Sequence, residues 1–526
     1  MTNHKGNSQF FKNPILPGFY PDPSICRVDE DYYLVTSSFA YYPGVPIFHS
    51  RDLVHWNQIG HVLNRESQLE LDHLEQSQGI YAPTIRYIHG EFYVVTTNVH
   101  KGGNFIVKAQ NPAGPWSDPY WLDAPGIDPS LFLDDDGTVY YIGTRPAPEG
   151  AKYYGNWEIW MQQLDLCTMK LTGDTYSLWR GALRDAVWPE GPHLYKRDGR
   201  YYLMISEGGT GHEHAITIAR SNEVKGPYEG NPGNPILTHR HLGRNYPIVN
   251  VGHGDLVETQ NGEWWMVLLA SRPYGGYYRN LGRETFLVPV VWEEGWPVVS
   301  PGTGKVEFEY AFPKLQEQKS RIKPCCDHFE ESILDALWNF IRTPREEFYS
   351  LSERAGCLRL KLLPSAVTGH GNVSFIGRRQ QHMSFLACTK MDFRPKAEGE
   401  EAGMVLYQNR KFNYRYTYAH RENKAIIQLV KCENGEEAIL AEQEISAERL
   451  YLKIEACGQA FNFYYGTSSD SETALLQNVD GRILSTDVAG GFVGAYIGLY
   501  ASGNGGISSN CADFDWFEYS GISNEP

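Results

Sequence analysis

The 526-residue sequence is short of basic side chains and of long apolar runs. It carries 47 Lys and Arg against 63 Asp and Glu, for a formal net charge of −16, and so lacks the basic surface that nucleic-acid binding requires. No apolar run reaches the roughly 18 residues of a membrane-spanning helix. Residues 1–10 also lack the apolar stretch of a signal peptide. We therefore expect a cytoplasmic protein that binds neither nucleic acid nor membrane.

The cysteines lack the spacing of a metal site or of a disulfide framework. There are nine of them, an odd number, and no C-x-x-C pair occurs. Zinc sites and small disulfide-rich domains depend on such spacing or pairing. The sequence also lacks a phosphate-binding glycine loop and a nucleophile elbow for a Ser-His-Asp triad. We therefore expect free thiols, in agreement with the cytoplasm, and no zinc.

Aromatic side chains, by contrast, are abundant and follow a repeated pattern. The sequence has 34 Tyr and 13 Trp. A polar or glycine-containing turn, two aromatic residues and a β-branched apolar run recur at residues 29–36, 90–96, 136–143, 198–205 and 261–268. Such a pattern is typical of the second strand of a hairpin, and all-β repeats of this size are typical of propeller blades. The sequence thus predicts a five-bladed β-propeller over residues 1–307.

Each predicted hairpin also has a recognisable first strand, and aligning these strands brings acidic residues together. Asp22, Ala82, Asp128 and His253 fall in one column, with Glu190 one position earlier. Equivalent positions on the innermost strands of a propeller converge at one mouth of the axis. A single Asp before Pro is usually a turn residue. Three acids in equivalent places indicate a catalytic cluster, because neighbouring carboxyl groups shift each other's pKa values apart.

Four segments around these acids resemble the motifs of glycoside hydrolase family 43. They are Phe-Tyr-Pro-Asp-Pro-Ser at 19–24, Gly-Ile-Asp-Pro-Ser at 126–130, Glu-Gly-Pro-His-Leu-Tyr at 190–195 and Leu-Gly-Arg-Glu-Thr at 281–285. The similarity extends over nearly the whole chain. It is greatest to the branch of β-xylosidases and α-L-arabinofuranosidases that carry an appended sandwich domain. The fold of that family is a five-bladed β-propeller, in agreement with the number of repeats.

The resemblance implies a role for each of the three acids. Asp22 would be the general base that activates a water molecule, and Glu190 the general acid that protonates the leaving oxygen. Asp128 would hold Glu190 in place and keep it protonated. The family inverts the anomeric carbon, which requires two carboxyl groups roughly 6.5–9.5 Å apart so that a water fits between the base and the sugar.

The resemblance also implies two polar residues that contact the sugar. Arg283 would reach into the pocket, although a structural salt bridge with Glu284 or another neighbour is the ordinary alternative. His253 matches a histidine near the propeller axis that contacts substrate or, through water, a central metal ion. Whether a Ca²⁺ ion binds near the axis stays open, but no run of oxygen-containing side chains indicates such a site. We assign no metal ligand and expect no required cofactor.

Aromatic residues near the motifs are candidates for stacking on the sugar. Phe39 and Tyr81 match the aromatic wall of the family's pocket and rank ahead of Tyr41, Tyr42 and Trp188, although packing within a blade is the ordinary alternative for each. The best-known xylosidase pattern has Trp where this chain has Tyr42 and Tyr81. The choice between xylose and arabinose therefore stays open.

The aromatic repeat stops near residue 299, and the C-terminal third is predicted to be a β-sandwich. Residues 308–326 are polar and contain prolines, which is typical of a linker. Residues 327–526 show short alternating runs that are typical of sandwich strands. By resemblance this is a concanavalin-A-like jelly roll, one loop of which closes part of the active-site rim. Residues 502–506 are the candidate loop, and an ordinary surface turn explains them as well.

The sequence thus predicts an exo-acting, inverting glycosidase. Its substrates would be xylo- and arabinoxylo-oligosaccharides, from which it would release terminal β-D-xylose, α-L-arabinofuranose or both. An enzyme that acts mainly as an α-L-arabinofuranosidase is the first alternative. A non-catalytic carbohydrate-binding propeller and a structural assembly protein are more distant alternatives, since neither explains the three acids. Relatives with this pair of domains are often dimers or tetramers, so the resemblance implies a homo-oligomer.

Overall fold

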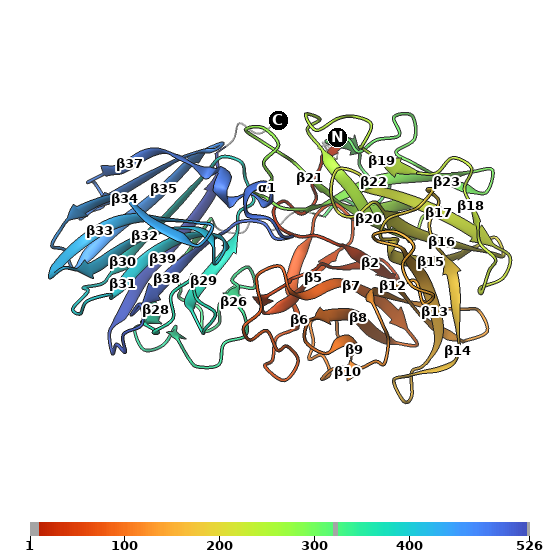
Figure 1. Cartoon of the computed structure of the whole chain (residues 1–526), viewed down its shortest axis with the longest axis horizontal. Coiled ribbons are helices and arrows are strands. Elements are labelled where there is room, and N and C mark those ends of the chain that lie inside the picture. The colour runs from red at the N-terminus through yellow and green to blue at the C-terminus, as the bar shows by residue number, and fades with distance from the viewer. Residues whose placement is uncertain (1–9, 319–324, 523–526) are drawn as a thin grey trace, which may run out of the picture.

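The computed structural model describes residues 10–318 and 325–522, which form two β-rich domains side by side (Figure 1). The propeller runs from red to green in the figure and the sandwich from cyan to blue. Helical structure in the described residues is confined to the 3-10 helix η1 (Gly481–Leu484) and the helix α1 (Thr486–Ala489). Helix α1 lies where the two domains meet. Neither helix has the length needed to cross a membrane.

The N-terminal domain consists of five antiparallel sheets, whose strands follow one another in the chain except that blade one passes over β4. Blade one has β2 (Ser24–Val28), β3 (Asp31–Val35), β5 (Gly44–Ser50) and β6 (Asn57–Leu63), and blade two has β7 (Gly79–Ile88), β8 (Glu91–Val99), β9 (Gly103–Ala109) and β10 (Tyr120–Trp121). Blade three has β11 (Ile127–Leu133), β12 (Val139–Pro146), β13 (Trp157–Asp165) and β14 (Lys170–Trp179). Blade four has β15 (Glu190–Arg197), β16 (Arg200–Glu207), β17 (Ala215–Ser221), β18 (Glu229–Gly230) and β19 (Leu237–Thr238). Blade five has β20 (Val249–Glu258), β21 (Trp264–Ser271), β22 (Glu284–Glu293) and β23 (Trp296–Val299). The predicted five-bladed propeller is confirmed, with one blade for each aromatic hairpin.

The first strand of every blade lies at the centre of the ring. Strand β2 contacts β7, β7 contacts β11, β11 contacts β15, β15 contacts β20, and β20 returns to β2. Residues at equivalent heights on these five strands therefore surround one axis.

The segment before blade one joins it to blade five. Strand β1 (Phe10–Lys12) pairs with β24 (Glu309–Ala311). The Asn13 side chain donates to the carbonyl oxygen of Leu287 in β22 and accepts from its N–H, both over 2.9 Å. Because β24 lies within residues 308–326, the first part of the expected linker packs on the propeller.

The C-terminal domain is a sandwich of two large antiparallel sheets. In order, one sheet has β27 (Tyr349–Ser350), β28 (Leu358–Lys361), β39 (Cys511–Gly521), β30 (Phe385–Asp392), β35 (Arg449–Cys457), β36 (Ala460–Gly466) and β37 (Thr473–Asp480), with β25 (Cys326–Asp327) beside β39. The other has β29 (Ser374–Arg379), β38 (Tyr496–Ser502), β31 (Glu401–Asn409), β32 (Phe412–Arg421), β33 (Lys424–Glu433) and β34 (Glu436–Glu444). The predicted sandwich is therefore confirmed.

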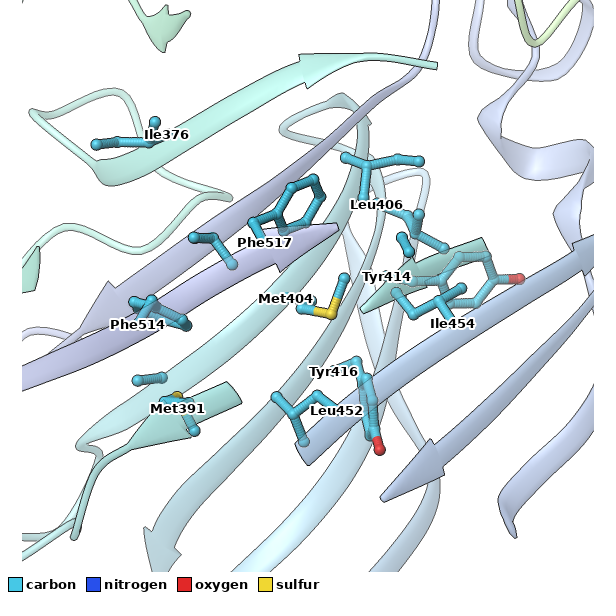
Figure 2. Close-up of a cluster of buried hydrophobic side chains, with 14 of the residues drawn as sticks. Ile376, Met391, Met404, Leu406, Tyr414, Tyr416, Leu452, Ile454, Phe514 and Phe517 are labelled. Carbon is cyan, nitrogen blue, oxygen red and sulfur yellow. The ribbon is translucent and has the colours of Figure 1, made fainter. Parts of the chain in front are cut away.

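The core of the sandwich follows from the period-two alternation of its strands. Met404 and Tyr416 of one sheet and Leu452 and Phe517 of the other are fully buried and point into the space between the sheets (Figure 2). Alternate residues of a strand face opposite sides, so one face of each sheet supplies this core. Replacing a buried Leu of this kind by Ala costs about 2–5 kcal/mol.

The two domains pack tightly against each other. Strand β26 (Phe340–Ile341) of the sandwich segment pairs with β4 (Tyr41–Tyr42) of the propeller. The ring of Tyr41 stacks on Tyr496 with the centroids 3.9 Å apart, and Tyr42 packs on Phe340. Tyr41 and Tyr42 therefore belong to the domain interface, and the structure does not support a role for them in sugar stacking.

Candidate active site

A cavity of about 590 Å³ opens at one end of the propeller axis. It is lined by all seven residues that the sequence predicted as catalytic or substrate-binding: Asp22, Phe39, Tyr81, Asp128, Glu190, His253 and Arg283. Trp188, which the sequence ranked lower, also lines it. Residues from all five blades, together with Arg283 of the segment between 281 and 285, thus meet in one place.

One position in each first strand adopts a left-handed backbone. The φ angles are +54° at Asp22, +30° at Ala82, +52° at Asp128, +54° at Gly191 and +48° at His253. In the four later blades, the pairing register shifts next to this position, as at a β-bulge. The column from the sequence alignment is therefore a real structural layer. Gly191 occupies it in blade four, and Glu190 projects from the position before it.

The carboxylate of Asp22 is held on both of its oxygens. Arg283 Nη1 donates to Oδ1 over 2.7 Å, and Ser37 Oγ donates to Oδ2 over 2.6 Å. Burial alone raises the pKa of Asp22, but the charges of Arg283 and His253 and the Ser37 bond outweigh it and hold the pKa below its usual range. Asp22 is thus a carboxylate at neutral pH, the form that accepts a proton from water.

Asp128 is tied to the backbone beside Glu190. Its Oδ2 accepts a hydrogen bond from the Gly191 N–H over 3.2 Å. Burial raises the pKa of Asp128 well above its usual range, and the nearby charges of Glu190 and Asp22 raise it further. Asp128 therefore fixes the bulge from which Glu190 projects.

Glu190 has a partner that sequence reasoning missed. Its Oε1 lies 3.1 Å from Nε2 of His214, a fully buried side chain at the start of β17. The hairpin pattern of the sequence could have placed His214 near the site. Glu190 pairs with Ser206 near the end of β16, so the turn that leads into β17 must lie at the same mouth of the propeller.

Arg283 contacts Asp22 in the cavity and does not pair with Glu284. Glu284 instead accepts from Arg272 Nε over 2.8 Å. Besides Asp22, Arg283 donates to Thr210 Oγ1 over 3.2 Å and to the carbonyl oxygen of Phe492 over 3.4 Å. This last bond ties the propeller pocket to the sandwich.

The sandwich completes the aromatic wall of the cavity. The ring of Phe492 is 41 % exposed and lies 6.3 Å from Phe39 and 6.2 Å from Tyr81, centroid to centroid. Thr486 and Gly491 of the same loop also line the cavity. Phe39, Tyr81 and Phe492 thus present an apolar surface of the kind on which sugar rings stack.

The segment of the sandwich that reaches the pocket is therefore residues 486–492, which comprise helix α1 and the loop after it, and of the two alternatives for residues 502–506 the surface turn is the one that agrees with the structure. That glycine-rich turn is bound within the sandwich, where Gly503 N donates to Leu363 O over 2.8 Å and Asn504 Nδ2 to Gly399 O over 2.8 Å. Its short glycine-rich sequence satisfies a turn without any contact with the propeller.

Hydrogen bonds at two of its residues, Asp487 and Phe492, anchor this segment to the propeller. The Arg279 N–H donates to Asp487 Oδ2, and Arg279 Nη2 to Asp487 Oδ1, each over 2.8 Å. The Phe492 N–H donates to Ser77 Oγ over 2.8 Å. No local pattern in the sequence indicates these pairs, because their partners are hundreds of residues apart in the chain.

Comparison with known proteins agrees with this geometry. The model of glycosyl hydrolases family 43 matches residues 11–297. The chain belongs to glycoside hydrolase family 43. A second model, the beta xylosidase C-terminal concanavalin A-like domain, matches residues 326–520, so the sandwich is the appended domain that the sequence predicted.

Several relatives of this family 43 chain match it along almost its full length. A protein of Butyrivibrio fibrisolvens named xylosidase/arabinosidase is 51% identical over 96% of this chain and 98% of its own. A non-reducing end alpha-L-arabinofuranosidase of Bacteroides ovatus is 41% identical over 99% of this chain and 96% of its own. The solved structure of a xylan beta-1,4-xylosidase from Bacillus halodurans has a TM-score of 0.92 at 36% identity, over 97% of this chain and 99% of that one. The chain is a glycoside hydrolase.

The axis beneath the pocket of this family 43 enzyme is filled by a guanidinium. Arg86 of β7 donates from Nη1 to Asp255 Oδ2 and from Nη2 to His193 Nδ1, each over 2.9 Å. Burial alone raises the pKa of Asp255, but Arg86 and His193 outweigh it and hold the pKa well below its usual range. Burial lowers the pKa of His193 to about 3, so its neutral ring accepts the Arg86 bond.

These axial residues do not fit a calcium ion. The carboxylate of Asp255 is already neutralised by Arg86, and a second cation beside that guanidinium would be repelled. The described residues also hold no cluster of three or more His, Cys, Asp or Glu side chains with metal-binding geometry.

Proposed function

We propose that this enzyme is an exo-acting, inverting pentosidase that removes terminal β-D-xylose, α-L-arabinofuranose or both from xylo- and arabinoxylo-oligosaccharides. The observation that carries the proposal is the placement of Asp22, Asp128 and Glu190 at the floor of a cavity whose wall is completed by Phe492 of the sandwich. A small sugar at the end of a chain suits this shape.

The shape of the cavity supports the exo mode. The Arg86–Asp255 pair and its partners fill the axis below the carboxyl groups. The loop at residues 486–492 stands over one side of the cavity. An oligosaccharide can insert one end into such a pocket, whereas a polymer running through it would meet the sandwich.

The arrangement of the acids supports inversion. Asp22 precedes the first strand of blade one and Glu190 begins that of blade four, and these blades are not neighbours in the ring. A water beside Asp22 would attack the anomeric carbon while Glu190 protonates the departing oxygen from the other side. The water gives one proton to Asp22, Glu190 gives one to the leaving group, and the C–O bond electrons go to that oxygen.

The identity of the sugar depends on the aromatic wall. Of the two positions at which this chain has Tyr where the best-known xylosidase pattern has Trp, only Tyr81 lines the cavity. A smaller ring there leaves more room beside Phe39 and favours no single pentose. The names of the relatives include both activities, so an enzyme that acts mainly on α-L-arabinofuranosides is the second candidate.

Initial rates on four substrates test the proposal. They are an aryl β-D-xylopyranoside, an aryl α-L-arabinofuranoside, xylobiose and an arabinose-branched xylo-oligosaccharide. Dominant rates on the xyloside and on xylobiose would identify a β-xylosidase, and dominant release of arabinose would identify a debranching arabinofuranosidase. No turnover of any of the four by folded enzyme would overturn the proposal. Proton NMR of the first anomer released tests inversion.

We also propose that the enzyme works in the cytoplasm on short imported oligosaccharides. The nine cysteines are all free thiols, as is usual in a reducing compartment. Cell fractionation tests this location. Self-association stays a prediction, which light scattering on the purified chain tests.

A further inference from the structure

His214 is a buried titratable side chain to which the proposed mechanism gives no role. Its ring has no solvent exposure and lies between two oxygens. Nε2 is 3.1 Å from Glu190 Oε1, and Nδ1 is 3.3 Å from the carbonyl oxygen of Asn250. The ring therefore connects the general acid to the backbone of blade five.

The backbone decides which ring nitrogen carries a hydrogen. A carbonyl oxygen can only accept, so Nδ1 of His214 must be the donor to Asn250. Nε2 is then the atom left to face Glu190 Oε1, and a hydrogen must lie between them, because two bare acceptors would repel each other. No hydrogen bond in the described residues involves Glu190 Oε2, so that oxygen is the one left to serve the substrate.

The surrounding chain is shaped to hold the ring in this place. Asn250 has a φ of +60°, and the pairing of β20 with β21 shifts between Val249 and Gly252. This kink directs the Asn250 carbonyl toward His214. A Cβ atom at Gly252 would lie 2.1 Å from Cε1 of His214 and 2.4 Å from Nε2, closer than real atoms approach. The ring can therefore occupy this site only because residue 252 has no side chain.

We propose that His214 is the positioning residue of the general acid, and this inference rests on the proposed function. With Nδ1 donating to Asn250 and Nε2 donating to Glu190 Oε1, the ring holds the carboxyl group with Oε2 toward the glycosidic oxygen. In the step, the proton on Oε2 passes to that oxygen, which keeps the electrons of the broken C–O bond. The Nε2–H bond stabilises the Glu190 carboxylate that forms.

The electrostatic surroundings suit a ring that donates from both nitrogens. The other charged or titratable groups that act on the pair or on its partners are Asp22, Asp128, His253 and Arg283. The Asp22 carboxylate and the carboxylate that forms on Glu190 both attract the positive end of the Nε2–H bond of His214, since opposite charges attract.

A leaving-group comparison on His214→Phe tests the proposal. Phe keeps a flat ring against Gly252 but has no donor for Glu190. We expect kcat on the disaccharide that the wild-type enzyme cleaves to fall at least about 10-fold, part of the 10²–10⁴-fold that general acid catalysis supplies. Rates on the matching 2,4-dinitrophenyl pentoside, whose leaving group needs no proton, should stay within about threefold. The alkaline limb of the disaccharide pH profile should move upward, because the carboxylate loses a hydrogen bond.

His239→Phe is the matched control. His239 is also buried and has its Nδ1 2.7 Å from a carbonyl oxygen, that of Ile248, but its Nε2 accepts from the Val306 N–H and meets no carboxyl group. This variant should leave the ratio of the two rates and the pH profile unchanged. Gly252→Ala tests the same contact without changing His214, because the added methyl group displaces the His214 ring. This variant should also lose rate on the disaccharide and keep its rate on the 2,4-dinitrophenyl pentoside.

The result that would overturn the role of His214 is an equal loss of rate on both substrates, or an alkaline limb that does not move. Either result counts in whichever of His214→Phe and Gly252→Ala folds, and either leaves the proposed function standing. A wild-type enzyme inactive on every pentoside would overturn the proposed function and this inference together.

Discussion

Arg283 Nη1 donates to Oδ1 of Asp22 over 2.7 Å, within a cavity where both side chains are buried. Arg283 directly precedes β22 of blade five, and Asp22 lies two residues before the start of β2 of blade one, so this bond closes the ring at the level of the pocket. The same contact keeps the Asp22 carboxylate ionised, because the guanidinium offsets the burial that would otherwise protonate it.

Asp22→Asn is expected to abolish most turnover and to spare binding. The amide keeps the shape of the side chain but cannot take a proton from water, so kcat should fall by about 10²–10⁴-fold. Calorimetric titration with xylose or arabinose should still detect binding. Rates near those of the wild-type enzyme would contradict the role of Asp22 as the base.

Glu190→Ala is expected to discriminate between leaving groups. An activated aryl glycoside departs without a proton, whereas a natural disaccharide needs one. The variant should therefore retain far more of its rate on the aryl substrate than on the disaccharide. Equal loss on the two substrates, measured side by side, would count against Glu190 as the acid.

Much of this site could be predicted because its pattern is local. The turn, the aromatic pair and the apolar run of each hairpin lie within about ten residues, and the backbone kink repeats at Asp22, Asp128 and His253. Aligning the strands was enough to bring the acids together. The kink itself was not predicted, although Asp22, Asp128, His253 and Gly191 are all of types that enter the left-handed region more readily than other residues.

What could not be predicted depends on contacts between distant parts of the chain. The bond from Arg283 to Phe492 spans 209 residues and that from Phe492 to Ser77 spans 415. Nothing near Phe492 distinguishes it from an exposed residue of a surface loop. The glycine-rich sequence of residues 502–506 suggested a loop that extends to the active site. Its glycines instead allow close backbone contacts within the sandwich.

Asp128→Asn is expected to move the alkaline limb of the pH–rate profile downward. The pKa of Asp128 is raised by burial and by the charges of Glu190 and Asp22, so the charges of Asp128 and Glu190 act on each other. Asn cannot carry the like charge that opposes a carboxylate on Glu190, so the acid form that catalysis needs should be lost at lower pH. The measurement is kcat/KM on the disaccharide from pH 5 to 9, and an unmoved limb would contradict this role.

Asp487→Asn is expected to weaken substrate binding through the sandwich loop. The change removes the charge that Arg279 contacts with its backbone N–H and its guanidinium, and so loosens the segment that carries Phe492. KM should rise several-fold, with little change in kcat, because the acids themselves are untouched. Phe492→Ala should show the same effect more strongly. Asp480→Asn is the control, since its partner Arg482 lies within the sandwich and outside the pocket lining.

Acid is expected to destabilise the fold through histidines that are buried in the neutral form. Burial lowers the pKa of His61 to about 3, whereas an unfolded histidine has a pKa of about 6.5. Below pH 6.5 the unfolded chain therefore binds a proton that the folded chain does not. The free energy of unfolding should fall by about 1.4 kcal/mol for each pH unit per histidine.

His61→Gln isolates this contribution. Gln does not titrate and can still accept a hydrogen bond from Gln58, which lies 3.2 Å from the histidine ring. The free energy of unfolding, measured with urea at pH 7, 6 and 5, should fall less steeply with decreasing pH in the variant, by the contribution of one proton. The loss of stability between pH 7 and pH 5 should therefore be smaller in the variant by about 2 kcal/mol. The exposed His241→Gln should keep the wild-type slope. If the free energy of unfolding of His61→Gln depended on pH as steeply as that of the wild-type protein, His61 would be protonated in the folded state. A positive charge would then be tolerated in the interior of blade one.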